Sequence, residues 1–341
     1  MQMRDDLGIT TKLENGKAYL EFVLPEKIGR LLSALQIEIW EGAEGERLVF
    51  HGEYSSEEAD SMTALLLRPH LWDGMRDPYV YLVKAQGRFR SVEYGEKMGG
   101  MEKEEKLDPA EDITGEVEMY WRQELTIYDV RVVEKKGILL NEKEFLPHEV
   151  VYRLPPQISD AGTRVEQVRR DLERLVRMGV NAIRLEGTGS GAERQNCYEV
   201  RAFYRLCRRG GFLTGDLWIR PENLPVYRGL PGETTCQALL AADGRTLTER
   251  YYYYQAKWSS EPVLYPVLST LHRQENGLLS LTIYSNQKKV VLYVDGLLFL
   301  FQTAASGDPE FIFEDIPVAK LPLHLAAEAG NLSISLTVTK L

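Results

Sequence analysis

The stretch VEQVRRDLERLVRMGVNAIRL, residues 165–185, decides the fold of the central part of the chain. Its apolar residues first recur at the spacing of one helix face, at Val165, Val168, Leu172, Leu175 and Val176. Gly179 suits the C-terminal cap of such a helix, and the apolar run after it predicts a buried strand over 180–185. A helix that leads directly into a buried strand indicates a β/α segment with a parallel sheet.

The pattern continues on both sides of this stretch. A second amphipathic helix is expected over about 198–209, because Gly210 and Gly211 would end it, and residues 212–214 then predict another strand. If residues 137–145 lead into a first strand, the order is β-α-β-α-β. That order requires parallel strands joined by right-handed crossovers.

The two flanks of the chain have a different period. Apolar and polar residues alternate over 18–24 and 35–40 near the N-terminus, and over 279–284 and 332–338 near the C-terminus. Alternation of this kind is typical of strands buried on one face only. Asp295-Gly296 adds a strong hairpin signal. Both flanks therefore predict β-sandwiches.

Composition narrows the class of protein. The 341 residues carry a net charge of −10, which disfavours nucleic acid and anionic membrane surfaces as partners. Three cysteines are too few for a disulfide framework and fit a reducing compartment. Neither a signal-peptide run nor a membrane span is evident, so a cytoplasmic location is expected. Histidines and cysteines lack metal-ligand spacing, and neither a metal nor a cofactor is predicted.

Charge is distributed unevenly along the chain. Residues 151–230 contain 14 Arg and no Lys against 9 acidic residues, a local net charge of +5. Solvated helix faces rich in Arg and Glu are the simpler interpretation. The alternative is a surface for an anionic ligand or an acidic partner domain.

Several motifs near the first domain boundary occur in the order found in one enzyme family. Residues 69–81, PHLWDGMRDPYVY, resemble the Pro-x-Leu-Trp…Pro-x-Leu-Tyr element of the immunoglobulin-like domain of family 2 glycoside hydrolases. Residues 128–131, YDVR, are similar to that family's Gly-Phe-Arg motif before the barrel, with only the Arg kept. Residues 137–145, GILLNEKEF, resemble its Gly-Phe-x-Leu-Asn-Gly-Lys hairpin.

The resemblance extends through the centre and the C-terminal part. Asp171-Leu172 together with residues 179–184, GVNAIR, resemble the family's Asp-Leu…Asn-x-Asn-Ala-Val-Arg helix and strand. Residues 203–212 are similar to its Phe-Tyr-x-Leu-Cys-Asp segment, and 243–259 to its last barrel helix. Residues 284–296 resemble the Ser-Asn…Asn-Gly pattern of its trailing sandwich.

The resemblance implies a mixed β and α/β fold, in which two immunoglobulin-like β-sandwiches flank a truncated (β/α) barrel remnant. The expected domains are a sandwich at 1–135, a partial TIM-barrel segment at 136–258 and a C-terminal sandwich at 259–341. A partial barrel would expose sheet edges. We therefore expect the sandwiches, a second copy of the chain or a partner protein to cover it.

The family's catalytic segment is missing. Its members hydrolyse β-linked sugars with a carboxylic acid and a carboxylate nucleophile about 5 Å apart. The barrel resemblance passes from its third strand, near Phe212, to its last helix, near Thr248, in about 35 residues. Four intervening β/α units at about 30 residues each do not fit in that interval. Asn141-Glu142 is the only Asn-Glu pair, and its hairpin position predicts a turn. No catalytic residue is therefore assigned.

A ligand site remains conceivable at the retained rim. Its candidate residues are Arg184, Glu186, Asp216 and Trp258. Arg184 is expected to pair with Glu186 or Asp216 at the strand end. Where the family has a Ser-His-Tyr-Pro segment, residues 187–191 read GTGSG. A loop in place of lost structure is the favoured interpretation of GTGSG, and a phosphate loop the alternative, although the Gly-Lys-Ser/Thr ending is absent.

Two functions of different class follow. The favoured hypothesis is a non-catalytic glycosidase homologue, a pseudoenzyme that binds carbohydrate or another protein. The alternative is a β-glycosidase in which residual carboxylates such as Glu186 and Asp216, or a partner chain, complete the site. A decayed gene product without a role is a third interpretation.

Overall fold

The computed structural model describes residues 7–92, 113–154, 161–186, 197–214, 224–229, 238–305 and 307–340. The chain divides into two compact units, Met1–Phe145 and Leu146–Leu341. Buried hydrophobic side chains form one core in the first unit and two in the second. The division into three domains at residues 135 and 258 stays a prediction.

The first unit is built almost entirely of strands. Its elements are β1 (Gly8–Glu14), β2 (Lys17–Val23), α1 (Glu26–Gly29), β3 (Leu32–Glu41), β4 (Arg47–Ser55), η1 (Ser56–Glu58), β5 (Thr63–Leu67), η2 (Gly74–Arg76), β6 (Tyr81–Val92), β7 (Ile113–Leu125), β8 (Val130–Val133), β9 (Gly137–Leu140) and β10 (Lys143–Phe145).

Two antiparallel sheets of the first unit, β1-β2-β5 and β4-β3-β6-β7, enclose its core. Ala18, Leu20 and Phe22 of β2 are at most 2% exposed, and the residues between them are exposed. The predicted alternation is thereby confirmed. A three-stranded and a four-stranded sheet in this order form an immunoglobulin-like sandwich.

Asn141-Glu142 forms the turn between β9 and β10. Both residues have positive φ, 50° and 68°, as a two-residue type I′ turn requires. The Asn141 side chain accepts a hydrogen bond from the Asp129 amide at 3.0 Å and donates one to the Trp72 carbonyl at 2.9 Å. The interpretation of this pair as a turn is confirmed.

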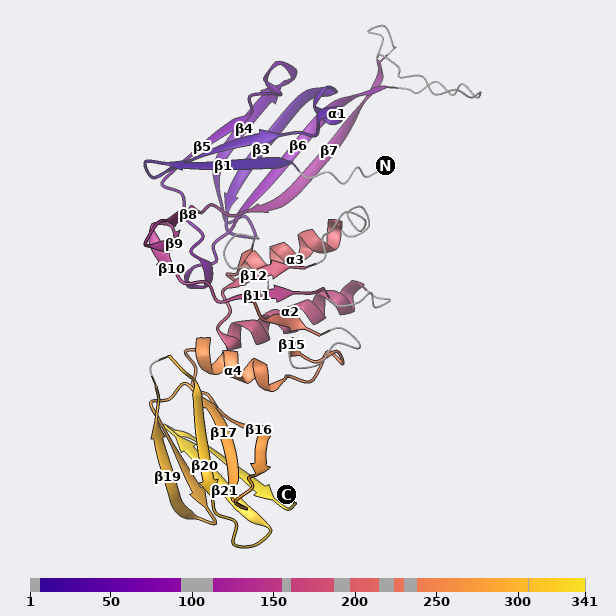
Figure 1. Cartoon of the computed structure of the whole chain (residues 1–341). Helices are drawn as coiled ribbons and strands as arrows, with labels where there is room; N and C mark the ends of the chain where they lie inside the picture. Colours follow the sequence, from indigo (N-terminus) through magenta and orange to yellow (C-terminus); the bar gives the residue numbers. More distant parts are fainter. Residues whose placement is uncertain are drawn as a thin grey trace, which may run out of the picture. The chain divides into compact units, whose positions relative to one another are not determined.

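The second unit begins with a β/α segment. Its elements are β11 (Glu149–Tyr152), α2 (Ala161–Met178), β12 (Ala182–Leu185), α3 (Cys197–Arg209), β13 (Leu213–Thr214), β14 (Val226–Arg228), β15 (Ala238–Leu240) and α4 (Glu249–Trp258). The five strands form one parallel sheet in the order β13-β12-β11-β14-β15 (Figure 1).

The described sheet is open, and its strand order differs from that of a barrel. In a (β/α)₈ barrel each strand pairs with the next one in the chain. Here β13 lies at one edge, whereas β14, the next strand, pairs with β11 on the other side. Five strands are too few to close at the usual tilt, since about eight enclose a packed barrel core. The expected partial barrel is therefore an open sheet with a topological switch between β11 and β14.

All three helices pack on one face of this sheet. Side chains of α2, α3 and α4 share a core with Tyr152, Ile183 and Tyr227. The predicted helix at 165–178 is confirmed, with Val168, Leu172 and Leu175 at most 7% exposed. Its predicted stripe is too wide, because Val165 and Val176 are 39% and 47% exposed.

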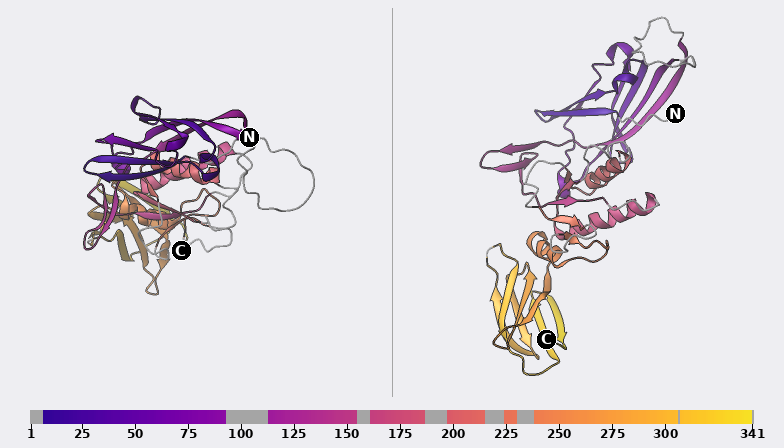
Figure 2. Two further views of the ribbon diagram at one scale, coloured as in Figure 1. Left: turned by 90° about the horizontal axis from the view of Figure 1, so that it is seen from above. Right: turned by 45° about the vertical axis from the view of Figure 1, so that its right-hand side comes forward.

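A second sandwich completes this unit. Its strands are β16 (Leu264–Arg273), β17 (Leu279–Ser285), β18 (Lys289–Val294), β19 (Leu297–Thr303), β20 (Glu310–Ile316), β21 (Leu323–Ala329) and β22 (Leu332–Val338). Its strands, drawn from orange to yellow in Figure 2, form the sheets β16-β17-β20 and β19-β18-β21-β22. This strand order repeats that of the first sandwich. Asp295 and Gly296, with φ of 47° and 81°, form the predicted hairpin turn.

Gly179, between α2 and β12, lies close to the C-terminal end of α4, so a substitution there can test this packing. Its φ is +88°, and a Cβ there would lie 2.4 Å from the Trp258 carbonyl oxygen. Gly179→Ala should cost about 1–2 kcal/mol for the left-handed conformation and a further ~1–3 kcal/mol for overpacking. Gly296→Ala is the matched control, because its φ is +81° and nothing lies within 4 Å of the added Cβ. Equal losses in urea unfolding would contradict this packing.

Candidate functional site

The sheet face opposite the helices carries the sequence-predicted Arg184. In the parallel register Glu149 pairs with Ala182 and Val151 with Arg184, so the side chains of Glu149 and Arg184 lie on the same face. Arg184 Nε donates to Glu149 Oε1 at 3.0 Å, and Glu149 is 1% exposed. Charged groups this buried persist only when paired. Glu149 is therefore a partner of Arg184 in the described part of the chain.

Glu186 binds a different arginine. The Nε and Nη2 of Arg153 both donate to the Glu186 carboxylate, the second at 3.3 Å to Oε1. Arg153 Nη1 also donates to the Arg228 carbonyl at 3.2 Å. Glu186 therefore pairs with Arg153 in the described part of the chain, because Arg153 follows β11 and Glu186 follows the parallel neighbour β12. The expected pairing of Arg184 with Glu186 or Asp216 stays a prediction. Asp216 and residues 187–191, the possible phosphate loop, lie outside the described residues.

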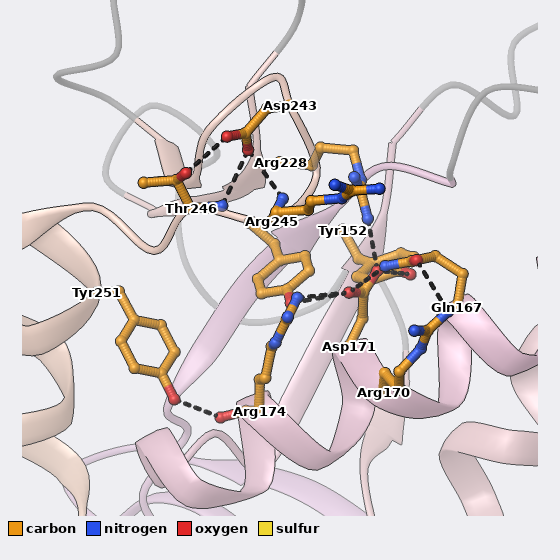
Figure 3. Close-up of polar contacts among 11 residues, drawn as sticks. Tyr152, Gln167, Arg170, Asp171, Arg174, Arg228, Asp243, Arg245, Thr246 and Tyr251 are labelled. Carbon is orange, nitrogen blue, oxygen red and sulfur yellow. Dashed lines mark hydrogen bonds and ion pairs between the residues drawn. The ribbon is translucent and has the colours of Figure 1, made fainter.

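Asp171 of α2 lies at the centre of a buried polar cluster in the second unit (Figure 3). Its carboxylate is 0% exposed. It accepts hydrogen bonds from Tyr152 Oη at 2.9 Å, Tyr227 Oη at 3.0 Å, Arg228 Nη2 at 2.7 Å and Gln167 Nε2 at 3.0 Å. Arg174 Nη1 lies 3.5 Å from Oδ1. Several donors, two of them cationic, offset the cost of burying this charge.

The two tyrosines of this cluster remain donors over the physiological pH range. Burial, followed by the charge of Asp171, raises the pKa of Tyr152 well above its ordinary value. The same two causes raise the pKa of Tyr227. Their hydroxyls therefore keep the protons that bind Asp171, and the cluster holds α2 against β11 and β14.

The loop after β15 supports Arg228 from its other side. Gly244 has φ of +69°, and a Cβ there would lie 2.6 Å from Arg228 Nη1. Asp243 accepts hydrogen bonds from the Arg245 amide at 2.8 Å, the Thr246 amide at 2.9 Å and Thr246 Oγ1 at 2.6 Å. These bonds, the Thr246 hydroxyl first, lower the pKa of Asp243 to about 2. The Asp-Gly motif therefore shapes a turn against Arg228.

Trp258, the fourth predicted residue, lies toward the other end of the strands. Its ring stacks on His148 at a centroid distance of 5.2 Å and packs against Tyr254 at 4.5 Å. His148 precedes β11, whereas Glu186 follows β12, and the two strands are parallel. The structure thus places Arg184 in β12 and Glu186 directly after it, whereas Trp258 lies near the opposite sheet end, where it packs against His148 and Tyr254.

Sequence reasoning missed the residues that complete these contacts: Glu149, Arg153, Tyr227 and Arg228. A signal existed for Glu149, since a lone acid at the start of the apolar run Val150–Tyr152 must pair if the run is buried. Val226–Arg228 is too short to show a period. Among the described residues, no group of three or more His, Cys, Asp or Glu side chains is placed to hold a metal ion.

No sequence-family profile matches the chain, and no curated protein matches its sequence. An FMN-binding β-glucuronidase from Faecalibacterium prausnitzii superposes over 98% of this chain and 74% of its own, with a TM-score of 0.65 and 13% identity. The fold is that of family 2 glycoside hydrolases.

Two further structures have the same fold. A glycosyl hydrolase family 2 member from Bacteroides cellulosilyticus gives a TM-score of 0.60 at 13% identity, over 98% of this chain and 63% of its own. A β-glycosidase from Bacteroides vulgatus gives 0.63 at 12% identity, over 98% of this chain and 64% of its own. The chain thus spans between 63% and 74% of the length of these three proteins. None of the helices described here is long and apolar enough to cross a membrane.

Removal of the Asp171 charge should destabilise the second unit. Asp171→Asn keeps the shape but leaves Arg228, whose side chain is 9% exposed, without its anion. We expect a loss of about 3–5 kcal/mol in urea unfolding. Glu173→Gln, two residues further along α2 and exposed, should stay within about 0.5 kcal/mol. An equal effect of the two substitutions would refute the role of Asp171.

The buried His148 side chain should make the folded protein less stable at mildly acidic pH. Burial lowers its pKa, and its ring hydrogen-bonds to the Gly179 carbonyl through Nδ1 at 2.9 Å. The unfolded chain binds the proton near pH 6.5, so it holds more protons than the folded chain just below that pH. The free energy of unfolding should therefore fall as pH drops from 7 to 5. His148→Phe should remove part of this dependence in urea titrations at several pH values, whereas His324→Phe, at an exposed position, should leave it unchanged.

Proposed function

We propose that this chain is a non-catalytic relative of the family 2 glycoside hydrolases and that it binds carbohydrate. The observation that supports this most is the state of the retained carboxylates. Glu149 is paired with Arg184, Glu186 with Arg153, and Asp171 with Arg228 and two tyrosines. A retaining glycosidase instead needs one carboxyl group that holds a proton and another free to attack the sugar.

The chain length between the retained barrel motifs also favours loss of catalysis. Phe212 and Thr248 are about 35 residues apart, and β13, β14 and β15 already lie within that interval. Four β/α units at about 30 residues each cannot be added there. The only Asn-Glu pair forms the β9–β10 turn in the first unit. We take the open sheet as the remnant of a barrel that lost its central units.

Carbohydrate is the ligand class that the fold comparison supports best. Structures similar to this chain include a β-glucuronidase and a β-glycosidase. Relatives that lose catalysis can keep binding surfaces outside the deleted segment. A fold alone does not determine a ligand, so the proposed carbohydrate binding is tested by direct measurement.

The test combines turnover with binding. We expect no hydrolysis of the nitrophenyl β-galactoside, β-glucuronide or β-mannoside above the buffer rate. Turnover that Glu186→Gln abolishes would establish the glycosidase alternative instead. Calorimetric titration with methyl β-glycosides and β-linked oligosaccharides should give saturable heat, and a flat response across the whole panel would end the carbohydrate proposal.

A further inference from the structure

The first sandwich has a polar groove on the outer face of its four-stranded sheet. The groove has a volume of about 590 Å³, and its lining residues lie on or beside β4, β3, β6 and β7. Figure 1 shows these four strands side by side. Its lining includes Gln36, Glu53, Ser55, Gln86, Arg88 and Glu118. All of these residues belong to the first unit, and none belongs to the strands that resemble the barrel.

Strand register arranges most of the lining side chains in two rows across the sheet, and it places Tyr120, which is not itself part of the lining, beside Gln86 at the end of one row. One row runs Glu53–Gln36–Gln86–Tyr120 and the next runs Ser55–Ala34–Arg88–Glu118. Because neighbouring strands are about 4.8 Å apart, each row is about 14 Å long. Ala34, the smallest side chain of the second row, lies between Ser55 and Arg88 and lines the groove. This length and shape suit a short linear chain laid across the strands.

Tyr120 ends the first row with an exposed and fixed aromatic ring. It is 67% exposed. Its hydroxyl donates to Glu118 Oε2 at 2.6 Å and accepts from Gln86 Nε2 at 3.0 Å. Two hydrogen bonds at the hydroxyl restrict the ring before any ligand arrives, so less conformational entropy is lost on binding. The negative face of an aromatic ring attracts the weakly positive C–H groups of a sugar.

Two side chains at the centre of the rows have no side-chain partner within the described residues. Gln36 and Arg88 form no side-chain hydrogen bond or ion pair there. Gln36 can both donate and accept, and Arg88 donates from a planar fork. By contrast, Glu58 at the groove end is held by the Ser55 amide and hydroxyl, both at 3.0 Å. Free donors and acceptors beside fixed ones match the hydroxyl groups of a sugar chain.

Charge in the groove selects between kinds of sugar. Its lining has three carboxylates, Glu53, Glu58 and Glu118, and one cation, Arg88. This balance repels the carboxylates of uronic acids and leaves hydroxyls as the preferred partners. We propose that the outer face of the β4-β3-β6-β7 sheet is a binding site for a neutral oligosaccharide. This rests on the proposed carbohydrate-binding role and assigns it to the first sandwich.

The test is calorimetric titration of the full chain with cellohexaose, xylohexaose and laminarihexaose, with hexagalacturonate as the anionic comparison. At least one neutral hexasaccharide should bind, more tightly than the uronate. Tyr120→Ala should weaken that binding roughly ten-fold or more, as expected for an aromatic anchor. Tyr120→Phe keeps the ring but loses both hydroxyl contacts. Its affinity should lie between that of the unsubstituted protein and that of Tyr120→Ala. Gln36→Ala should also weaken it.

Tyr19→Ala is the matched control, because Tyr19 lies on the other sheet of the same sandwich and is 42% exposed. It should leave the affinity unchanged, and thermal melts should show that all variants fold. Binding that survives Tyr120→Ala and Gln36→Ala would overturn this site and leave the carbohydrate-binding role standing. Preference for hexagalacturonate would overturn the neutral class. No binding by any sugar would overturn both proposals.

Discussion

The arrangement of the second unit depends on the burial of one carboxylate. Asp171 on α2 binds Tyr152 on β11 and both Tyr227 and Arg228 on β14. The ladder holds β14 to β11 through a single registered pair, Val151 with Val226, so backbone pairing alone fixes this strand weakly. A buried charge must keep its donors, and Asp171 therefore imposes a position on β14 that the short ladder would not. The same cluster fixes the edge to which β15 attaches and, through β15, the place of α4.

Sequence periodicity predicted the elements with clear repeats. The helix at 165–178, the strand after it and the alternating strands of both sandwiches were predicted from periodicity, because each spans enough residues to show its period. The helix before Trp258 was expected from the family resemblance instead. The side-chain pairs between neighbouring strands could not be predicted from periodicity. Period gives the face on which Arg184 lies, but the register that brings Glu149 to it depends on pairing between distant segments.

The groove of the first sandwich illustrates the same division. Alternation in β3 indicated which residues point away from the core, and it therefore placed Gln36 at the surface. It did not indicate that Gln36 lies in line with Glu53, Gln86 and Tyr120, which come from three other strands. A surface built by lateral alignment has no local signature in the chain. Sites carried by sheet faces are accordingly harder to foresee than loops or helix ends.

The switch in strand order has a consequence for any attempt to rebuild a barrel. Both edges of β11 are occupied, by β12 and β14, and the outer edge of β15 carries a bridge from Leu240 to Leu247. Among the described strands, β13 is therefore the one with an open edge, and a strand supplied by another molecule could add there. A strand that joins at β13 would extend the open sheet and leave β14 in place beside β11, so the product would differ from a closed barrel.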